Sequence, residues 1–354
     1  MNNMKNLNKI IGIIVFGLIS SNSFAQDIHF SQFYTNPLQQ NPAMAGLVYG
    51  MEANVIYKDQ WRAIGAPYKT FAAGYDMRFQ QKRSQSGYLT AGINLFSDKA
   101  GDSQLSTTSA NLSLAYVVKL DKFNRMGGGV QLGYFQKSVD FTALQWGNQY
   151  DGFAYDGSLS NGEQTFGTST LGKFDMGAGL SWIYNNTGGD IKVTDNHDLN
   201  FNAGISVLHL NRPNISFYGN EDRLPMRFVA HANGVISFQE TKMALVPGLM
   251  YYKQGKQQEI YFGTLVRYLI TQDSKYTGIN QASAFYMGTY IRAKDAITAK
   301  FIYEYAGWGI GIAYDINTSS LKAGTLSRGG LEIALKFNGP NPFIKSYGAN
   351  HSRY

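Results

Sequence analysis

Hydrophobic and polar residues alternate with a period of two along most of the chain after residue 50. In one such stretch the apolar residues Phe71, Ala73, Tyr75, Met77 and Phe79 are separated by glycine, alanine and charged residues. A period of two is typical of a β-strand whose faces meet different surroundings, because successive side chains point to opposite sides. The pattern therefore predicts strands with one apolar and one polar face.

The same alternation predicts about fourteen strands. Most are ~9–13 residues long, which suits a tilted strand crossing a bilayer, whereas strands of soluble proteins average about five or six. The expected strands are at 51–58, 70–79, 88–95, 111–119, 130–134, 174–182, 199–207, 226–238, 242–252, 258–270, 282–292, 295–305, 308–316 and 329–338.

These strands favour a membrane barrel over a soluble secreted β-sandwich, which also alternates but has shorter strands. After the N-terminal region no window holds ~18 uninterrupted apolar residues, so no transmembrane helix is predicted. The mean hydropathy of −0.24 suits strands in which only every second residue faces lipid. Aromatic residues recur near the expected strand ends, as in the girdles of membrane barrels. We expect an all-β, antiparallel outer-membrane β-barrel.

The connections predict the orientation of this barrel. An even number of strands puts the N- and C-termini on the periplasmic side, so the connections after odd strands face outside. Three long connections, near 140–170, 209–225 and 317–328, all follow odd strands, although the turns at 185–197 and 271–281, after even strands, are longer than ideal. Long outer loops and short inner turns are the outer-membrane pattern.

Four segments are expected along the chain. Residues 1–25 resemble a cleavable signal peptide, with Lys5 and Lys9 ahead of an apolar run and small residues before Gln26. Residues 26–50 form an aromatic segment with two Asn-Pro steps, 51–338 the barrel, and 339–354 a tail. Proline stiffens the second segment, which is built either to be held by something or to be a mobile chain end.

Composition narrows the functional classes. The 354 residues include no cysteine, which excludes disulfides and thiolate metal sites. The formal charge of +7 falls to +5 when Lys5 and Lys9 leave with the signal peptide. Lys and Arg are scattered rather than gathered in a stripe, so no nucleic-acid partner is expected.

No catalytic signature is present: the sequence has no G-x-S-x-G, P-loop or H-E-x-x-H motif, so no enzyme, cofactor or metal site is predicted. His209 and His231 are expected near the outer ends of adjacent strands. They are interpreted either as a metal pair or hydrolase base, or as residues packing in the wall.

Charged residues on the inward face predict a polar network in the lumen, either structural or lining a channel. Its expected members are Asp76, Arg78, Asp175, Arg227, Arg267, Arg292 and Glu332. The long aromatic loop at 140–170 is interpreted either as a protein-docking surface or as a plug resting in the barrel mouth.

Seven stretches, taken in order, resemble the PorP/SprF family over nearly the whole chain after residue 25. They are HFSQFYTNPLQQNPAMAG from His29, YKDQWRAIGAPYKTFAAGYDMRF from Tyr57, FDMGAGLSW from Phe174, SVLHLNRPNISF from Ser206, LPMRFVAHANG from Leu224, IGIAYDINTSSL from Ile310 and GGLEIALKF from Gly329.

The resemblance implies a fourteen-stranded outer-membrane barrel of the type IX secretion and gliding motility machinery of Bacteroidetes. Members partner the periplasmic ring of the machinery, or large surface adhesins with a type B C-terminal signal. The resemblance carries no catalytic residues. It makes the opening motif a partner-docking candidate, namely His29, Phe30, Ser31, Gln32, Phe33, Tyr34, Asn36, Pro37, Asn41, Pro42 and Gly46. The candidates in the outer loops are Trp146, Tyr150, Phe153, Tyr155, His209, Asn211, Arg212 and Pro213.

The leading hypothesis is a non-enzymatic, multi-pass outer-membrane barrel that helps to export an adhesin or anchors it at the surface. Anchoring of the periplasmic ring is the alternative within the family. The second hypothesis is a passive channel for small solutes, which the polar residues expected in the lumen permit. The third hypothesis is an outer-membrane hydrolase that uses His209 or His231.

Overall fold

The computed structural model describes residues 27–62, 67–79, 86–101, 103–140, 144–162, 169–188, 199–238, 240–272, 281–319 and 322–341. The predicted signal peptide and residues 342–354 of the predicted tail lie outside the described residues.

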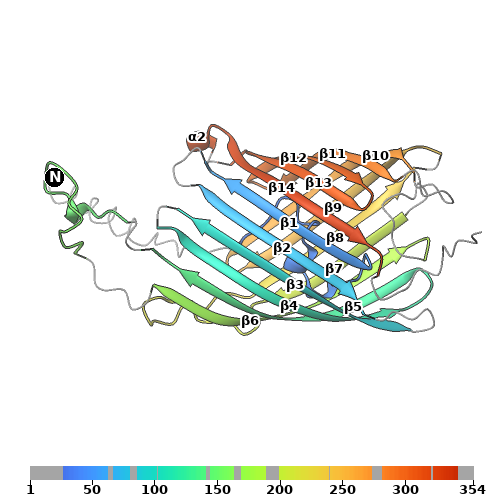
Figure 1. The fold of residues 1–354 in the computed structure, drawn as a ribbon, viewed down its shortest axis with the longest axis horizontal. Helices are drawn as coiled ribbons and strands as arrows, with labels where there is room; N and C mark the ends of the chain where they lie inside the picture. The colour runs from blue at the N-terminus through green and yellow to red at the C-terminus, as the bar shows by residue number, and fades with distance from the viewer. Residues whose placement is uncertain are drawn as a thin grey trace, which may run out of the picture.

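Fourteen antiparallel strands close into a barrel in which each strand pairs with its neighbours in the chain and β1 pairs with β14 (Figure 1). All fourteen predicted strands are confirmed, and several are longer than expected. Their bounds are β1 Met51–Gln60, β2 Tyr68–Arg78, β3 Gly87–Ala100, β4 Leu105–Lys119, β5 Asn124–Ser138, β6 Thr170–Asn185, β7 Leu199–Leu208, β8 Arg227–Ser237, β9 Met243–Gln254, β10 Gln257–Thr271, β11 Ser283–Arg292, β12 Ala296–Tyr305, β13 Trp308–Asn317 and β14 Arg328–Gly339.

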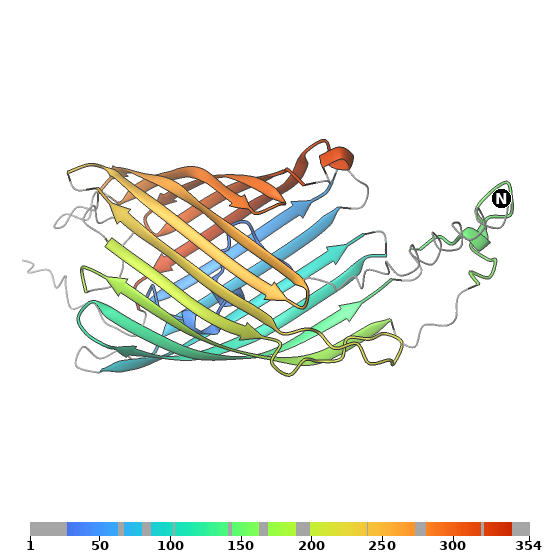
Figure 2. The same ribbon diagram turned by 180° about the vertical axis from the view of Figure 1, so that it is seen from behind.

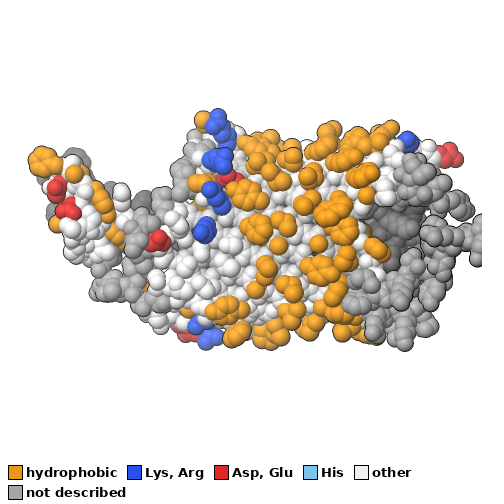
Figure 3. All heavy atoms as spheres, in the orientation of Figure 1, with side chains coloured by type: hydrophobic (Ala, Val, Ile, Leu, Met, Phe, Trp, Pro, Cys, Tyr) orange, Lys and Arg blue, Asp and Glu red, His pale blue; other side chains and the backbone are white. Residues whose placement is uncertain are grey.

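The outer surface of the barrel is apolar because the alternation places every second side chain outward. Leu89, Ile93 and Leu95 of β3 are about half exposed, whereas the intervening Thr90 and Asn94 are buried inside. Figure 3 shows hydrophobic side chains spread as a belt over this face, with Lys and Arg gathered beside its end near α2 (Lys322–Thr325). Lipid is the solvent that makes such a belt favourable.

The two ends of the barrel differ. At the long-loop end lie the three long connections at 139–169, 209–226 and 318–327, as well as shorter ones. At the short-turn end β1 begins and β14 ends, together with turns such as 120–123 and 306–307. The two longest connections, 139–169 and 209–226, thus share one end, as expected. The connections at 186–198 and 272–282, at the short-turn end, are longer than 318–327, so the expectation that the long connections all lie at the long-loop end is wrong. Which end faces the cell exterior stays a prediction.

The N-terminal segment lies inside the barrel, where it is seen in blue behind the strands in Figures 1 and 2. We call its described residues, 27–50, the plug. Both Asn-Pro steps start short 3₁₀ helices, η1 (Pro37–Gln39) and η2 (Pro42–Met44). Proline suits a first helical position because its missing N–H needs no partner there. The Asn41 side chain accepts a hydrogen bond from Ala43 N at 2.9 Å and caps η2.

Candidate functional site

Ser31 and Gln32 bind the plug to one wall of the lumen. The Glu332 carboxylate of β14 accepts hydrogen bonds from the backbone N–H groups of Ser31 (2.8 Å) and Gln32 (2.7 Å). The Ser31 hydroxyl donates to Asp315 of β13 at 2.8 Å and accepts from Arg292 of β11 at 2.9 Å. Charged groups that bind backbone in a buried site form strong hydrogen bonds, so these wall residues fix the entry of the plug.

Asn41 binds the opposite wall. Its amide nitrogen donates to Leu180 O (3.0 Å) and Ser181 Oγ (2.9 Å) of β6. The glycines of the wall permit this approach. A Cβ at Gly129 would lie 2.7 Å from Ala43 N, closer than atoms pack. The Asn-Pro step is therefore fitted to a glycine-lined part of the wall.

The last turn of the plug is held by β2. Gly46 adopts a left-handed conformation (φ 56°), which favours glycine. Its N–H donates to Asp76 Oδ1 at 2.8 Å, and Arg78 donates to the carbonyls of Leu47 (3.1 Å) and Val48 (2.9 Å). Asp76 and Arg78 thus serve the plug backbone as acceptor and donor.

Apolar contacts complete the fit. The ring of Phe33 packs edge-on against Tyr261 of β10 and Tyr290 of β11, with ring centroids 5.9 and 6.1 Å apart. Phe30 lies among small and branched residues of β1, β2 and β14. Both rings are almost fully buried. The plug contacts all fourteen strands through these apolar contacts and its polar ones. Its polar partners also include Lys58 of β1, Asn94 of β3 and Lys300 of β12.

At the long-loop end the plug begins in a charged latch, so Asp27 lies at the end opposite to the start of β1, which differs from the expectation that the chain begins on the side of the short turns. His209, just after β7, lies between Asp27 (Nε2 to Oδ2, 2.5 Å) and Asp175 of β6 (Nδ1 to Oδ2, 2.9 Å). Burial favours the neutral imidazole, but the two carboxylates outweigh it and raise the pKa of His209 to about 10. Burial disfavours the Asp27 carboxylate too, yet His209 and Arg227 hold the pKa of Asp27 well below its usual range.

The latch is expected to weaken as the pH rises above neutrality. Because the pKa of folded His209 lies above its usual value near 6.5, its contribution is complete below pH ~6.5 and is lost progressively towards pH 10, by up to ~1.4 kcal/mol per pH unit. Asp27, whose pKa is lowered, keeps its contribution throughout this window. Single-barrel recordings in planar bilayers should show transient openings that become more frequent between pH 6 and 9. An identical rise in a His209→Gln variant would assign the effect to another group.

The seven predicted lumen residues all lie in the wall around the plug. Asp76, Arg78, Arg292 and Glu332 contact the plug as described above, and Asp175 contacts His209. Arg227 approaches Asp27 at 3.8 Å and stacks on the Tyr252 ring at 4.6 Å. Arg267 donates to Ser237 at 3.0 Å. The plug, which the sequence did not place in the lumen, supplies many of their partners.

Several residues that hold the plug were missed by the sequence reasoning. Asp315 and Lys300 bind Ser31, and Tyr252 hydrogen-bonds with His29 Nδ1 at 2.9 Å. Asp315 and Lys300 have inward positions in the alternation of β13 and β12, so strand parity applied to every charged residue could have found them. Tyr252 has no such signal, because tyrosine is common on both faces.

The eleven candidates of the opening motif lie in the lumen, most of them fully buried. In this arrangement their side chains contact the barrel wall, so a partner does not reach them from outside. The partner-binding role of this motif stays a prediction. The role that the structure gives these residues is to plug the barrel.

The outer-loop candidates separate into two groups. His209 belongs to the latch. The Asn211 side chain donates to Phe174 O (2.8 Å) and accepts from Met176 N (3.2 Å), so it extends the edge of β6. Arg212 and Pro213 follow in the same loop, where Pro213 O accepts from Leu224 N at 3.0 Å.

The second group forms a folded projection beyond the barrel, which we call the projecting loop (residues 144–162; Figures 1 and 2). It holds η4 (Gly147–Gln149) and a bridge between Tyr150 and Tyr155. Phe153 is 95% exposed, Tyr150 58% and Tyr155 45%, whereas Trp146 is half-buried. The interpretation of this loop as a plug resting in the barrel mouth is wrong for residues 144–162, because they project away from the barrel.

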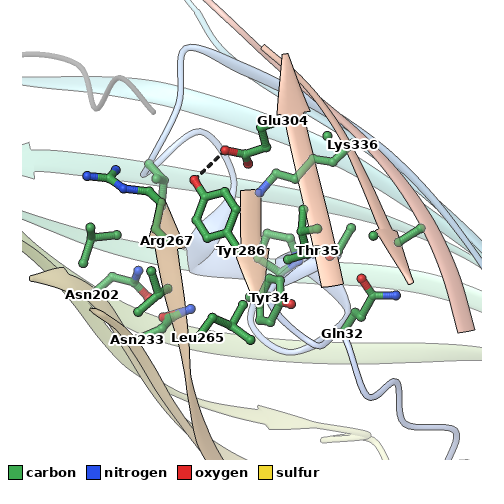
Figure 4. Close-up of a pocket in the computed structure, with 18 of the residues that line it drawn as sticks. Gln32, Tyr34, Thr35, Asn202, Asn233, Leu265, Arg267, Tyr286, Glu304 and Lys336 are labelled. Carbon is green, nitrogen blue, oxygen red and sulfur yellow. Dashed lines mark hydrogen bonds between the residues drawn. The ribbon is translucent and has the colours of Figure 1, made fainter. Parts of the chain in front are cut away.

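A cavity of about 170 Å³ remains between the plug and the wall in the half of the lumen near the short-turn end (Figure 4). Tyr34 and Thr35 line it from the plug, and Arg267, Glu304 and Lys336 from the strands. Tyr286 donates to Glu304, and Lys336 pairs with Glu52 at 3.1 Å. Glu304 and Lys336 thus find partners within the wall of the cavity.

Within the described ranges, no group of three His, Cys, Asp or Glu residues could hold a metal ion. No helix in the part of the chain that the structure describes is long and apolar enough to cross a membrane.

The closed barrel, its lipid-facing belt and its plugged lumen define an integral β-barrel membrane protein. Residues 22–337 match the family model described as "Type IX secretion system membrane protein PorP/SprF". The chain belongs to this family and is a multi-pass protein of the outer membrane.

Solved outer-membrane barrels resemble the chain only distantly. A FadL homologue from Pseudomonas aeruginosa is 10% identical, with a TM-score of 0.43, over 84% of this chain and 92% of that one. BamA from Haemophilus ducreyi lacking POTRA domains 1–3 is 8% identical, with a TM-score of 0.42, over 82% of this chain and 70% of that one. Among curated proteins, none matches the chain significantly.

Proposed function

We propose that this protein is a non-enzymatic, plugged platform that holds a large secreted surface protein at the outer membrane. The partner class is an adhesin with a type B C-terminal signal, delivered by the type IX machinery. It docks on the long-loop end, which faces the cell exterior in this proposal.

The plug is the observation that carries this proposal. A lumen filled by buried contacts to all fourteen strands is poorly suited to the passage of solutes. The alternative function as a passive channel therefore requires the plug to leave. If the plug stays in place, partners bind to the surfaces at the two ends of the barrel.

The projecting loop supports the choice of the long-loop end. Its shape is fixed from within: Tyr155 OH donates to Gln149 Oε1 at 3.1 Å, and Gln149 Nε2 donates to Leu159 O at 3.1 Å. The Asp151 carboxylate accepts the N–H groups of Phe153 and Ala154 at 2.7 Å. Exposed aromatic side chains on a fixed scaffold are typical anchors of protein interfaces, because their surface is buried at little cost in conformational entropy.

Replacing the two most exposed anchors with alanine, Tyr150→Ala with Phe153→Ala, should release the partner. If each anchor contributes ~2 kcal/mol to the free energy of binding, we expect the fraction of the partner retained at the surface to fall by tenfold or more. Flow cytometry of intact cells with an antibody against the partner measures retention. Phe238→Ala, an exposed aromatic residue at the short-turn end, is the matched control and should retain it.

Unchanged retention in the double variant would remove the projecting loop as the docking site. Loss of retention in Phe238→Ala alone would move the site to the short-turn end. That outcome favours the alternative within the family, anchoring of the periplasmic ring.

A further inference from the structure

Four basic residues form a row at the long-loop end of the barrel, on four strands that are neighbours in the sheet. They are Arg328 at the start of β14, Arg62 just after β1, Lys69 of β2 and Lys99 of β3, and all four are exposed. Figure 3 shows Lys and Arg side chains gathered there, beside α2. Because neighbouring strands lie ~4.8 Å apart, the row spans roughly 14 Å of the rim. We call these four residues the basic row.

The basic row lies on the lipid-facing side of the strands and not in the lumen. In β2, Lys69 is two residues from the outward Phe71. In β3, Lys99 is four residues from the outward Leu95. Residues an even number apart share a face of a strand, so both lysines point outward, at the edge of the apolar belt. Arg328 is paired with an outward isoleucine of β13 and points the same way.

The strand register concentrates positive charge in this row. Lys69 and Lys99 are directly opposite each other. Like charges in this position destabilise a strand pair, and an anion bound between them removes that cost. Asp59 of β1 is opposite Lys69 on the other side, but Arg62 binds its carboxylate at 2.6 Å. The four cations and this one carboxylate together carry a formal charge of +3.

An aromatic pair marks the lipid–water boundary at the basic row. The rings of Trp61 and Tyr68, at the adjoining ends of β1 and β2, have centroids 4.8 Å apart. Such rings, each with one polar atom, are typical of the membrane interface. Lys and Arg side chains at this depth lay their methylene stems along apolar surface and keep their charged heads among the lipid headgroups. The basic row is therefore at the depth of the lipid phosphates.

We propose that the basic row binds the headgroup of a lipid that carries two phosphate groups, in the leaflet at the long-loop end. Lys and Arg donate charge-assisted hydrogen bonds to phosphate oxygens, and a guanidinium can donate two at once. A row of four cations over four strands is longer than one phosphate, which favours a headgroup with two. A phosphate between Lys69 and Lys99 supplies the counter-charge for both. This binding is independent of the proposed docking function, because its ligand is a component of the membrane.

Lys69→Gln with Lys99→Gln tests the site. The glutamines remove two charges and leave the ion pair beside them intact. Lys122→Gln with Lys242→Gln is the matched control, because it removes two exposed charges at the short-turn end. The purified barrel in detergent micelles is titrated with diphosphoryl lipid A, and bound lipid is counted by native mass spectrometry. The affinity should fall on the order of tenfold or more in the first variant and stay unchanged in the control.

Two further ligands separate the lipid from its parts. The same lipid without its phosphates should bind the unmodified barrel about as weakly as diphosphoryl lipid A binds the Lys69→Gln, Lys99→Gln variant. Inorganic pyrophosphate at the same concentration should not compete, because it lacks the acyl chains that the apolar belt contacts. Equal affinity of the unmodified barrel and the variant for diphosphoryl lipid A overturns the proposal, and so does an equal fall in the control. Full competition by pyrophosphate overturns it as well, because the ligand would then be a free anion.

Thermal unfolding gives a second test, which also shows whether the variant is folded. Without added lipid the Lys69→Gln, Lys99→Gln variant should melt no lower than the unmodified barrel, because the substitutions remove a repulsion. Diphosphoryl lipid A should raise the melting temperature of the unmodified barrel, since a ligand stabilises the state that binds it, and leave that of the variant nearly unchanged. An equal rise in both contradicts the proposal. Loss of partner retention on cells in the variant, with unchanged lipid binding, would contradict it too, because the basic row would then serve an acidic protein.

Discussion

Deleting residues 27–49 is expected to turn a closed barrel into an open pore. The strands keep their complete ladder, and the lumen that loses the plug is lined by charged residues such as Lys58, Asp76, Arg292 and Glu332. Water would hydrate these groups and fill the space, since a fourteen-stranded barrel lies between small filled barrels and water-filled porins in diameter. Planar-bilayer recordings should show stable conductance at least about tenfold above that of the unmodified protein.

The control for this experiment is the Tyr150→Ala, Phe153→Ala variant, which changes the projecting loop and leaves the plug in place. It should stay closed. An equally high conductance of the unmodified barrel would show that the plug does not seal the lumen. The passive-channel hypothesis would then return.

Arg292→Met is expected to cause the largest loss of stability of any single substitution in the plug–wall contacts. The guanidinium of Arg292 is buried and lies 3.3 Å from both Glu259 and Asp315, and it donates to the Ser31 hydroxyl. Methionine keeps the apolar stem but leaves two buried carboxylates without their cation. Breaking a buried ion pair from one side costs about 3–5 kcal/mol.

Thermal unfolding in detergent micelles measures this loss. Arg223→Met is the matched control, because Arg223 forms an ion pair with Glu221 in which both side chains are exposed, and exposed pairs contribute about 0–1 kcal/mol. Equal melting temperatures for the two variants would show that the Arg292 cluster does not stabilise the folded barrel.

The barrel could be predicted from the sequence because lipid imposes a local rule. Every strand alternates on its own, so β3 or β13 is recognisable without knowledge of its neighbours. Parity then says that Asp76, Arg292 and Glu332 point inward. Strand length and alternation are therefore sufficient to predict the strands of the barrel wall and the polar character of its inner surface.

The plug could not be placed in this way, because its contacts are not local. Ser31 meets Glu332 across 301 residues of sequence and Asp315 across 284, and no periodic signal connects them. The two Asn-Pro steps indicated a stiff segment that is held by something. They do not distinguish the wall of its own barrel from another protein, since both offer backbone and carboxylate partners.

Asn211 shows the same limit on a smaller scale. Its position in a loop predicted a docking residue, but its side chain completes the edge of β6. Whether an exposed amide meets a partner or its own strand depends here on how β6 pairs with β7, because the β6–β7 ladder reaches only Ala178 opposite Val207 whereas β6 begins at Thr170. This offset is a property of register, and a one-residue change in register alters every contact along the edge.

The most direct test of the docking claim is photo-cross-linking in intact cells, with the cross-linking amino acid at Phe153 in one strain and at Lys122 in another. Phe153 lies in the projecting loop and Lys122 in the exposed turn between β4 and β5, at the opposite end. A docked surface protein predicts an adduct with a large multidomain secreted protein from position 153 and none with it from position 122. Adducts with periplasmic components from position 122, and none from 153, would contradict the account.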